Sequence, residues 1–507
     1  MELTELVNKF MELLKVEKIE DAPDALMQVL LQNETKYFDD WLKSFADLTT
    51  DNLQPIYQYY MADRKNKMQD YTPKTLAKAC AMLVKIGDAN SCYDMCAGSG
   101  ALTIQAWNIN KNCNFICEEF DERVIPFLIF NLAIRNINAT VINGDVLKQE
   151  RFASYKLTPT EKYSVITKAE NPKEIITDVC ISNPPYNMRW EHEPFMQIDK
   201  RFNAYGVPPE SNANYAFVLT ALAVAKRAVL IMPNGINEGG TKPETEIRKN
   251  LADMNKIESV IINPDNMFES TSIGTCLFCI NNNKTTIQTE MIDTRDTYAE
   301  EKREQRGQFG GKSHTNRVYT KTVKTYTDDN IKSMLDAIAN KMCKAGYCQS
   351  VNINDIKSAE YALAPSRYVK FEYIETAHRN YADIVADLNR VIAEKNCCKL
   401  VINETLAKRL GFDVDLYKKD AIDSDFTDFI TKIAGDKILK SDYIQFTKSK
   451  NEFTFKNNSA EFISTILTSI LQTWKQHIMY LNQTENRYLA ELRDAVLPEF
   501  MSGKLKI

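Results

Sequence analysis

Short runs of strand-forming residues alternate with helical segments from Tyr71 to about residue 283, and no other feature of the chain constrains the fold as strongly. Seven runs can be read as strands: SCYDM, NFICEE, TVING, DVCISN, AVLIMP, ESVIIN and GTCLFCIN. Strands that alternate with helices form a parallel sheet covered on both faces. The sequence therefore predicts an α/β fold for this region.

The rest of the 507-residue chain is expected to form further domains, because one compact core rarely grows to this length. We predict an N-terminal helical region at 1–66, the sheet domain at 67–340 and a mainly helical C-terminal region at 341–507. The last region ends in a long apolar stripe at steps of three and four: Ile463, Leu467, Ile470, Trp474, Ile478, Leu481, Tyr488, Leu492 and Val496. Such a stripe suits a helical hairpin or a partner helix, with packing inside its own domain as the alternative.

The charge of the chain limits its partners without excluding nucleic acid. A net charge of −5 argues against a non-specific polyanion binder, yet a local basic cleft remains compatible with it. Residues 301–324 hold seven Lys or Arg against two Glu and are predicted to be a basic loop, either solvated or in contact with DNA. Within it, GQFGGKS has one residue too few between its glycines for a phosphate-binding loop.

Cysteine usage and apolar runs indicate a reduced, cytoplasmic protein that does not enter a membrane. The twelve cysteines fall in predicted strands and helices, and MELTELVNKF does not resemble a secretory signal. The pair in CLFC, Cys276 and Cys279, is read as part of a strand, so no metal site is predicted. The longest apolar run, YAFVLTALAVA, is too short to span a bilayer.

Polar residues stand at the ends of four successive predicted strands. Asp94 is followed by a glycine turn with Gly98 and Gly100, which lets a ligand approach the backbone at the start of a helix. Glu119 ends the second strand and suits ribose hydroxyls, and Asp145 ends the third and suits an adenine amino group. Each carboxylate alone fits a helix cap better. Together they predict one crevice, because these strand ends meet at one edge of a sheet.

The fourth strand ends at Asn183 and is followed by Pro184, Pro185 and Tyr186. An amino group conjugated to a planar ring is a poor nucleophile and needs acceptors aimed at its N–H bonds. The Asn183 side-chain oxygen and the Pro184 carbonyl are two such acceptors, and the prolines fix their direction in advance. Tyr186 offers a flat face for stacking on a base. The alternative, a plain turn between strand and helix, is disfavoured by the acids upstream.

These motifs, in the order DYTPKTLAKAC, DMCAGSG, CEEFD, NGD and NPPY, resemble the gamma arrangement of N6-adenine DNA methyltransferases. Met95 stands where proline is frequent in that family. Later segments, such as NYAFVLTALAVAKRAVLIMPNGI and SAEYALAPSRYV, resemble modification subunits of type I restriction–modification systems, over roughly residues 68–370. The final YLAELRDAVLPEFMSGKLKI resembles the spacer helix and tail of the specificity subunits.

The resemblance implies a Rossmann-like methyltransferase sheet, S-adenosyl-L-methionine as cofactor and a flipped adenine in duplex DNA as substrate. It implies a partner as well, a specificity-type subunit or a second copy bound through the C-terminal helix. It assigns cofactor binding to Tyr71, Thr72, Pro73, Asp94, Ala97, Gly98, Gly100, Glu119, Asp145 and Asn183. It assigns catalysis to Asn183, Pro184, Pro185 and Tyr186, and contact with the target base to Tyr186, Asn187 and Phe217. For Phe217, core packing is the favoured interpretation.

Two other classes of function remain open at this point. The NPPY motif also serves methyltransferases that act on a protein glutamine or on RNA. The length of this chain and its segments that resemble modification subunits speak against them. A non-catalytic DNA-binding subunit that kept the fold is the third possibility, which the intact motif from Asn183 to Tyr186 disfavours.

Overall fold

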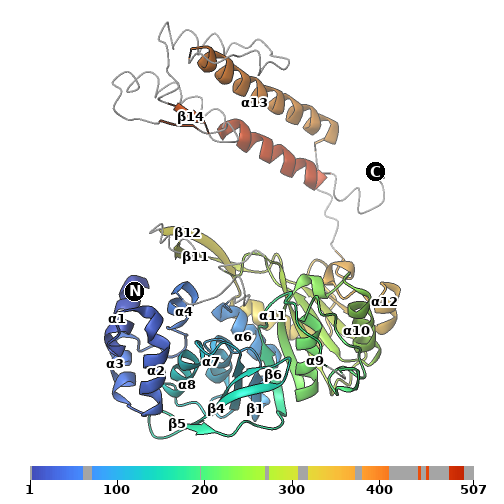
Figure 1. The fold of residues 1–507 in the computed structure, drawn as a ribbon. Coiled ribbons are helices and arrows are strands. Elements are labelled where there is room, and N and C mark those ends of the chain that lie inside the picture. Colours follow the sequence, from blue (N-terminus) through green and yellow to red (C-terminus); the bar gives the residue numbers. More distant parts are fainter. Residues whose placement is uncertain are drawn as a thin grey trace. The chain divides into compact units, whose positions relative to one another are not determined.

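The structure is a computed structural model that describes residues 3–60, 71–193, 196–268, 273–306, 318–370, 379–409, 444–446, 453–455 and 479–495. The chain divides into two compact units, Met1–Glu372 and Tyr373–Ile507 (Figure 1). This boundary lies later than the predicted one at residue 340, because Cys348–Val351 joins the sheet of the first unit as its edge strand.

The first unit is built on one eleven-stranded sheet in the order β13-β10-β8-β9-β7-β6-β1-β2-β3-β4-β5. Its strands are β1 (Ser91–Asp94), β2 (Asn114–Glu119), β3 (Ala139–Asp145), β4 (Glu150–Thr158), β5 (Val165–Ala169), β6 (Thr177–Ser182), β7 (Ala225–Pro233), β8 (Ile257–Ile262), β9 (Thr275–Asn281), β10 (Thr289–Asp293) and β13 (Cys348–Val351). All seven predicted strands are confirmed. The pair Cys276 and Cys279 lies inside β9, as predicted, and both are free thiols.

The order of the strands creates a crevice between β1 and β6. Strands β7, β6, β1, β2 and β3 are parallel neighbours, and the chain runs outward from β1 through β2 to β3 before it returns to β6 on the other side of β1. Ligands of open α/β sheets bind at such a reversal, outside the carboxyl ends of the strands. Asp94 is the last residue of β1, and Asn183 directly follows β6, the two strands that flank this crevice.

Helices cover both faces of the sheet, as the alternation predicted. Successive residues of β7 point to opposite faces, so Val229 and Ile231 join one apolar core and Leu230 and Met232 the other. The first core includes helices α1 (Leu3–Leu14), α2 (Ala22–Leu31), α3 (Lys36–Ser44), α4 (Gln54–Tyr60), α6 (Lys74–Leu83), α7 (Ala101–Ile109), α8 (Ile125–Ala133) and α11 (Asp328–Asn340). The second includes α9 (Asn214–Val224), α10 (Lys242–Asp253) and α12 (Ile353–Ser358).

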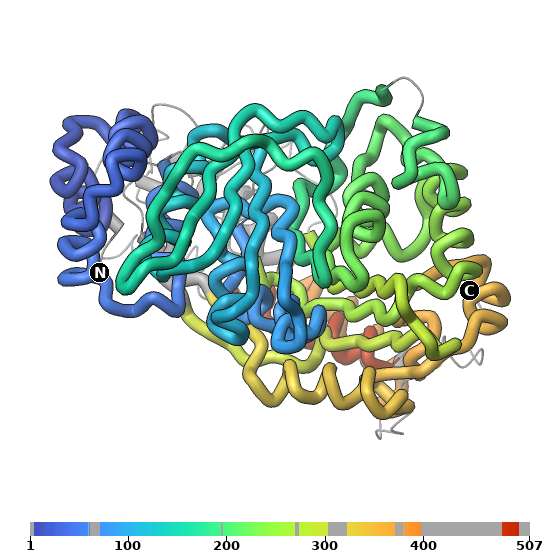
Figure 2. Tube along the Cα trace, turned by 90° about the horizontal axis from the view of Figure 1, so that it is seen from below, coloured from blue at the N-terminus to red at the C-terminus, as the bar shows by residue number. Residues whose placement is uncertain are grey.

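The N-terminal helices belong to the first unit and share its core. Phe10 and Trp41 are buried together with Phe127 and Phe130 of α8, with ring centroids 5.6 Å apart for Phe10 and Phe127. Figure 2 shows these helices, in dark blue, beside the strands of the β4–β5 side of the sheet, where Asn33 hydrogen-bonds to the backbone of Ile166. The predicted region 1–66 is therefore not a separate domain in its described part.

The predicted basic loop at 301–324 is largely a β-hairpin, and this expectation is corrected. Strand β11 (Ala299–Arg306) pairs antiparallel with β12 (Val318–Thr325). The charged residues hid the strand pattern, because the signal for a strand in sequence is alternation of apolar and polar residues. The segment GQFGGKS lies outside the described residues.

In the second unit, α13 (Tyr381–Arg409) runs beside a helix over residues 479–495, and a short hairpin joins β14 (Ile444–Phe446) to β15 (Phe453–Phe455). Lys395 of α13 pairs with Glu485, and Arg379, just before α13, pairs with Glu491, so the two helices run antiparallel. Leu481, 2% exposed, lies on the same helical face as Glu485, and Val391 precedes Lys395 by one turn on α13. The polar segment 482–487 is helical and does not interrupt the stripe.

The described part of the apolar stripe thus packs within its own unit and does not need a partner helix to cover it. Tyr488 is buried as well, and Leu492 is half-buried on the same face. Ile463, Leu467, Ile470, Trp474, Ile478 and Val496 lie outside the described residues, so partnership through them stays a prediction. Within the described ranges, no helix combines the length and apolarity needed to cross a membrane.

Candidate active site

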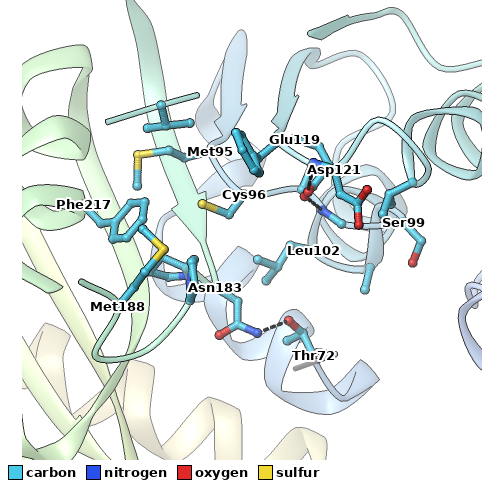
Figure 3. A pocket seen from close by; sticks show the side chains of 18 of the residues that line it. Thr72, Met95, Cys96, Ser99, Leu102, Glu119, Asp121, Asn183, Met188 and Phe217 are labelled. Carbon is cyan, nitrogen blue, oxygen red and sulfur yellow. Dashed lines mark hydrogen bonds between the residues drawn. The ribbon is translucent and has the colours of Figure 1, made fainter. Parts of the chain in front are cut away.

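A cavity of about 240 Å³ opens at the carboxyl ends of β1, β2, β3 and β6, where the strand order reverses (Figure 3). Eleven of the predicted site residues line it: Tyr71, Thr72, Ala97, Gly98, Glu119, Asp145, Asn183, Pro184, Pro185, Tyr186 and Phe217. They come from segments up to 146 residues apart in sequence, between Tyr71 and Phe217. The fold therefore brings together most of the residues that strand-end reasoning singled out.

The glycine turn after β1 needs its two glycines. Gly98 and Gly100 have φ angles of +53° and +100°, a region that disfavours residues with a Cβ. A Cβ at Gly100 would also lie 3.0 Å from the Cδ1 of Leu128. Helix α7 starts directly afterwards at Ala101, so the turn places backbone N–H groups of a helix start at the cavity.

Glu119, and not its neighbour Glu118, faces the cavity. The Glu119 carboxylate accepts hydrogen bonds from the backbone N–H of Gly98 at 2.9 Å and of Asp121 at 2.8 Å. Glu118 points to the other face of the sheet, is 1% exposed and accepts from the Tyr93 hydroxyl at 2.7 Å. Burial raises the pKa of Glu118. The alternation of strand residues makes Glu119 the acid available to a ligand.

Asp145 stands at the end of β3, as predicted, and lines the cavity. Its Oδ1 accepts from the backbone N–H groups of Leu147 at 2.9 Å and Lys148 at 3.1 Å. These bonds hold the loop after the strand. They involve Oδ1 alone, and the described residues give Oδ2 no hydrogen bond, so the carboxylate combines a structural role with capacity for a ligand.

Asn183 is held from two sides. Its Nδ2 donates to the Oγ1 of Thr72 at 3.0 Å (Figure 3). Its Oδ1 accepts from the Tyr186 hydroxyl at 2.6 Å. Both partners line the same cavity. The contacts fix the plane of the amide before any substrate binds, and a carbonyl oxygen has a second lone pair for a further donor.

Tyr186 is only 6% exposed, because its ring packs edge-on against Phe268 with centroids 6.3 Å apart. Its hydroxyl therefore positions Asn183, while little of its ring reaches the cavity. Phe217, on α9, is buried and yet lines the cavity beside Met188 (Figure 3). The core-packing interpretation of Phe217 and its contact with a ligand are therefore compatible.

Four predicted site residues do not line the cavity: Pro73, Asp94, Gly100 and Asn187. Pro73 is buried at the N-cap of α6, and Gly100 is buried at that of α7. Asn187 instead exchanges hydrogen bonds of 3.0 Å with Asn214, which ties the NPPY loop to the start of α9. The sequence distance between Asn187 and its partner explains why this structural role was not foreseen.

Asp94 is fully buried beneath the glycine turn. Its Oδ2 accepts from the Thr103 hydroxyl at 2.7 Å, while Oδ1 is buried without a hydrogen-bond partner among the described residues. Burial raises the pKa of Asp94 to about 7. A buried acceptor without a donor is costly, so this oxygen is suited to a donor that arrives with a ligand.

Twelve further residues line the cavity: Met95, Cys96, Ser99, Ala101, Leu102, Phe120, Asp121, Val124, Gly144, Val146, Leu147 and Met188. All lie within five residues of a predicted site residue, so extending the strand-end rule along each loop would have found them. Phe120 is 55% exposed, and an aromatic ring of that exposure beside Glu119 is a flat face open to a ligand.

The segment just before α4 anchors the glycine turn. Asp51 is buried and accepts from the Ser99 hydroxyl at 2.5 Å and from the Asn131 side chain at 2.8 Å. Arg135 donates to the backbone oxygens of Leu48 at 2.7 Å and Thr50 at 2.6 Å. Burial raises the pKa of Asp51, an effect that these hydrogen bonds and the charge of Arg135 oppose.

Tyr57, on α4, adds a second anchor. Its hydroxyl donates to the Oδ2 of Asp121 at 2.7 Å, and its ring packs edge-on against Tyr71 with centroids 5.5 Å apart. Asp121 and Tyr71 both line the cavity. The N-terminal region thus supports the cavity wall through contacts that local sequence patterns do not predict.

We expect Tyr57→Phe to lower the free energy of unfolding by about 1–3 kcal/mol, because the buried Asp121 carboxylate loses a donor while the ring packing is kept. Urea unfolding measures the change. Tyr37→Phe is the matched control, since no hydrogen bond of its hydroxyl occurs among the described residues. Equal stability of the two variants would show that the Tyr57 hydroxyl does not anchor the wall.

Comparison with known proteins decides the family. The model of the family described as N-6 DNA Methylase matches residues 48–377, which is most of the first unit, starting at the segment that anchors the glycine turn. The chain belongs to the N-6 DNA methylase family. The cavity described above is lined by eleven of the fifteen residues expected from the motif order.

Two curated members of related sequence are subunits of type I restriction enzymes. The MpnII methylase subunit of Mycoplasma pneumoniae is 26% identical over 368 residues, which cover 69% of this chain and 62% of that protein. The HindI methylase subunit of Haemophilus influenzae is 24% identical over 388 residues, 71% of this chain and 78% of that protein. The chain therefore spans less than two thirds of the first of these relatives.

This chain is also similar to a solved structure, the methyltransferase subunit of a type I restriction–modification system from Streptococcus thermophilus. The match has a TM-score of 0.49 and 20% sequence identity, and it covers 73% of this chain and 80% of that chain.

Proposed function

We propose that the chain transfers the methyl group of S-adenosyl-L-methionine to the exocyclic N6 of an adenine flipped out of duplex DNA, as the modification component of a restriction–modification system. The observation that carries the proposal is Asn183, held by Thr72 and Tyr186 in the same cavity as Glu119 and Asp145. Membership of the N-6 DNA methylase family supports the reaction, and the names of the relatives support the biological setting.

The residues present fit S-adenosyl-L-methionine, which supplies an activated methyl group when it is bound. Glu119 would accept from the ribose hydroxyls and Asp145 from the adenine amino group, while Phe120 offers a ring face. Tyr71 and Thr72 close the same cavity from the start of α6.

The chain's own groups prepare the target nitrogen for attack. The Asn183 Oδ1 and the Pro184 carbonyl accept from its two N–H bonds, so charge that develops on nitrogen is stabilised in the transition state. With the cofactor bound, its activated methyl group would pass to this nitrogen, S-adenosyl-L-homocysteine would be the leaving group, and the nitrogen would lose one proton to water. We assign no general base, since the proton becomes acidic once the new bond forms.

The experiment incubates the full chain with methyl-labelled S-adenosyl-L-methionine and, separately, duplex DNA, RNA or protein. Label recovered as N6-methyladenine in DNA supports the proposal. Label in RNA or in a glutamine side chain favours the alternative methyltransferases. If cofactor and DNA both bind without transfer, then the chain is a binding subunit. Adding a co-expressed neighbouring subunit tests whether transfer to a defined site needs a specificity-type partner, which we also propose.

A further inference from the structure

The hairpin β11–β12 has no role in the proposed reaction. Its register is regular from Ala299↔Thr325 to Arg306↔Val318, and it forms a two-stranded sheet apart from the main one. Eight residues in each strand give a ribbon roughly 26 Å long. Figure 1 shows it projecting from the first unit.

The root of the hairpin is attached to the two segments that hold the catalytic amide. The backbone N–H of Lys324 donates to the Asn266 oxygen at 3.2 Å, two residues before Phe268, whose ring packs against Tyr186. The backbone N–H of Tyr326 donates to the Thr75 hydroxyl at 3.4 Å, three residues after Thr72.

Further contacts make this root rigid. The Tyr326 hydroxyl donates to the Asn263 side chain at 2.8 Å and is 2.7 Å from the Thr294 hydroxyl. Val323 is fully buried, and the Lys324 ammonium lies 4.0 Å from the centre of the Tyr298 ring. The ribbon therefore starts from fixed positions next to the segments that contain Phe268 and Thr72.

The charge of the ribbon is opposite to that of the chain. Its two strands contain five cationic residues, Lys302, Arg303, Arg306, Lys321 and Lys324, against three glutamates, Glu300, Glu301 and Glu304, for a net charge of +2. The whole chain carries −5. In the backbone register, Arg303 stands directly opposite Lys321.

We propose that the β11–β12 hairpin is an arm that binds the phosphate backbone of the DNA duplex beside the target adenine. The inference rests on the proposed function, which makes duplex DNA the substrate. A two-stranded ribbon fits the major groove of B-DNA. Phosphate contacts supply the affinity and the register of such complexes, and an acidic protein must concentrate them locally.

The test compares two double variants of the full chain that lose the same charge. Arg303→Ala with Lys321→Ala alters the arm, whereas Lys168→Ala with Lys173→Ala alters exposed positions at and after β5, the far edge of the main sheet. Binding to a short duplex is followed by fluorescence anisotropy over a range of salt concentrations. The arm variant should lower the slope of log Kd against log salt by about 2 and weaken binding about tenfold or more.

The control variant should keep the wild-type slope, and both variants should keep wild-type affinity for S-adenosyl-L-methionine in calorimetry. Lys302→Ala with Arg306→Ala repeats the test on one strand, in case the first arm variant misfolds. An unchanged slope in the folded arm variants overturns the inference, as does wild-type protein that does not bind duplex at low salt. A wild-type protein that binds DNA through the arm but transfers no methyl group overturns the proposed function alone.

Discussion

Replacing Asn183 with alanine should reduce the rate of methyl transfer about 100- to 1,000-fold or more, the largest effect that we expect from a single change. The variant lacks the Oδ1 acceptor, which matters most as charge develops on the target nitrogen, a loss of about 3–4 kcal/mol. The rate is measured in single turnover with saturating cofactor, so that binding does not limit it.

Affinity for S-adenosyl-L-methionine should stay near that of the wild type, because the substitution leaves the proposed acceptors of the ribose and the adenine, Glu119 and Asp145, unchanged. Asn203→Ala, at an exposed position, is the matched control and should leave the rate unchanged. A variant of Asn183 that kept half of its turnover would rule out the role proposed for this residue.

Glu119→Gln should weaken S-adenosyl-L-methionine about 30- to 1,000-fold, which corresponds to roughly 2–4 kcal/mol, because hydrogen bonds from ribose hydroxyls to a charged acceptor are lost. The substitution preserves the shape of the side chain. It leaves one oxygen for the Gly98 or Asp121 backbone N–H, so the glycine turn keeps part of its support. Isothermal titration calorimetry gives the affinity.

Glu118→Gln is the matched control, since it makes the same change one residue earlier on the opposite face of β2. We expect it to affect the free energy of unfolding through its bond to Tyr93 and its proximity to Arg151, while cofactor affinity stays unchanged. If Glu118→Gln weakened the cofactor and Glu119→Gln did not, the assignment of the ribose acid would have to be exchanged.

The N-terminal segment changes how variants outside the motifs should be interpreted. Asp51 and Tyr57 contact Ser99 and Asp121 through buried hydrogen bonds, although they precede them by 48 and 64 residues. Substitutions there act on the cavity through its wall and not through contact with substrate. A loss of activity in such a variant should be compared with its free energy of unfolding, so that loss of folded protein is separated from loss of catalysis.

The sequence alone determined the central strands, and it determined that most of the site residues gather at the carboxyl ends of these strands. Strands such as β1, β2 and β6 are buried on both faces, so their apolar runs are strong signals, and parallel neighbours place their carboxyl ends at one edge. That rule places Glu119, Asp145 and Asn183 together without any knowledge of distances. Strand β4 was not predicted, since its residues are half-exposed and their apolar periodicity is weak.

Only the tertiary structure decided which side chains reach the cavity. Asp94 is buried beneath the glycine turn, and Asn187 hydrogen-bonds to Asn214. The charged stretch forms the β11–β12 hairpin. Leu481 is covered within the second unit, where sequence suggested a partner. The physical reason is the same in each case. Burial and hydrogen bonding between residues far apart depend on how elements pack, whereas local propensity and periodicity report only on neighbours along the chain.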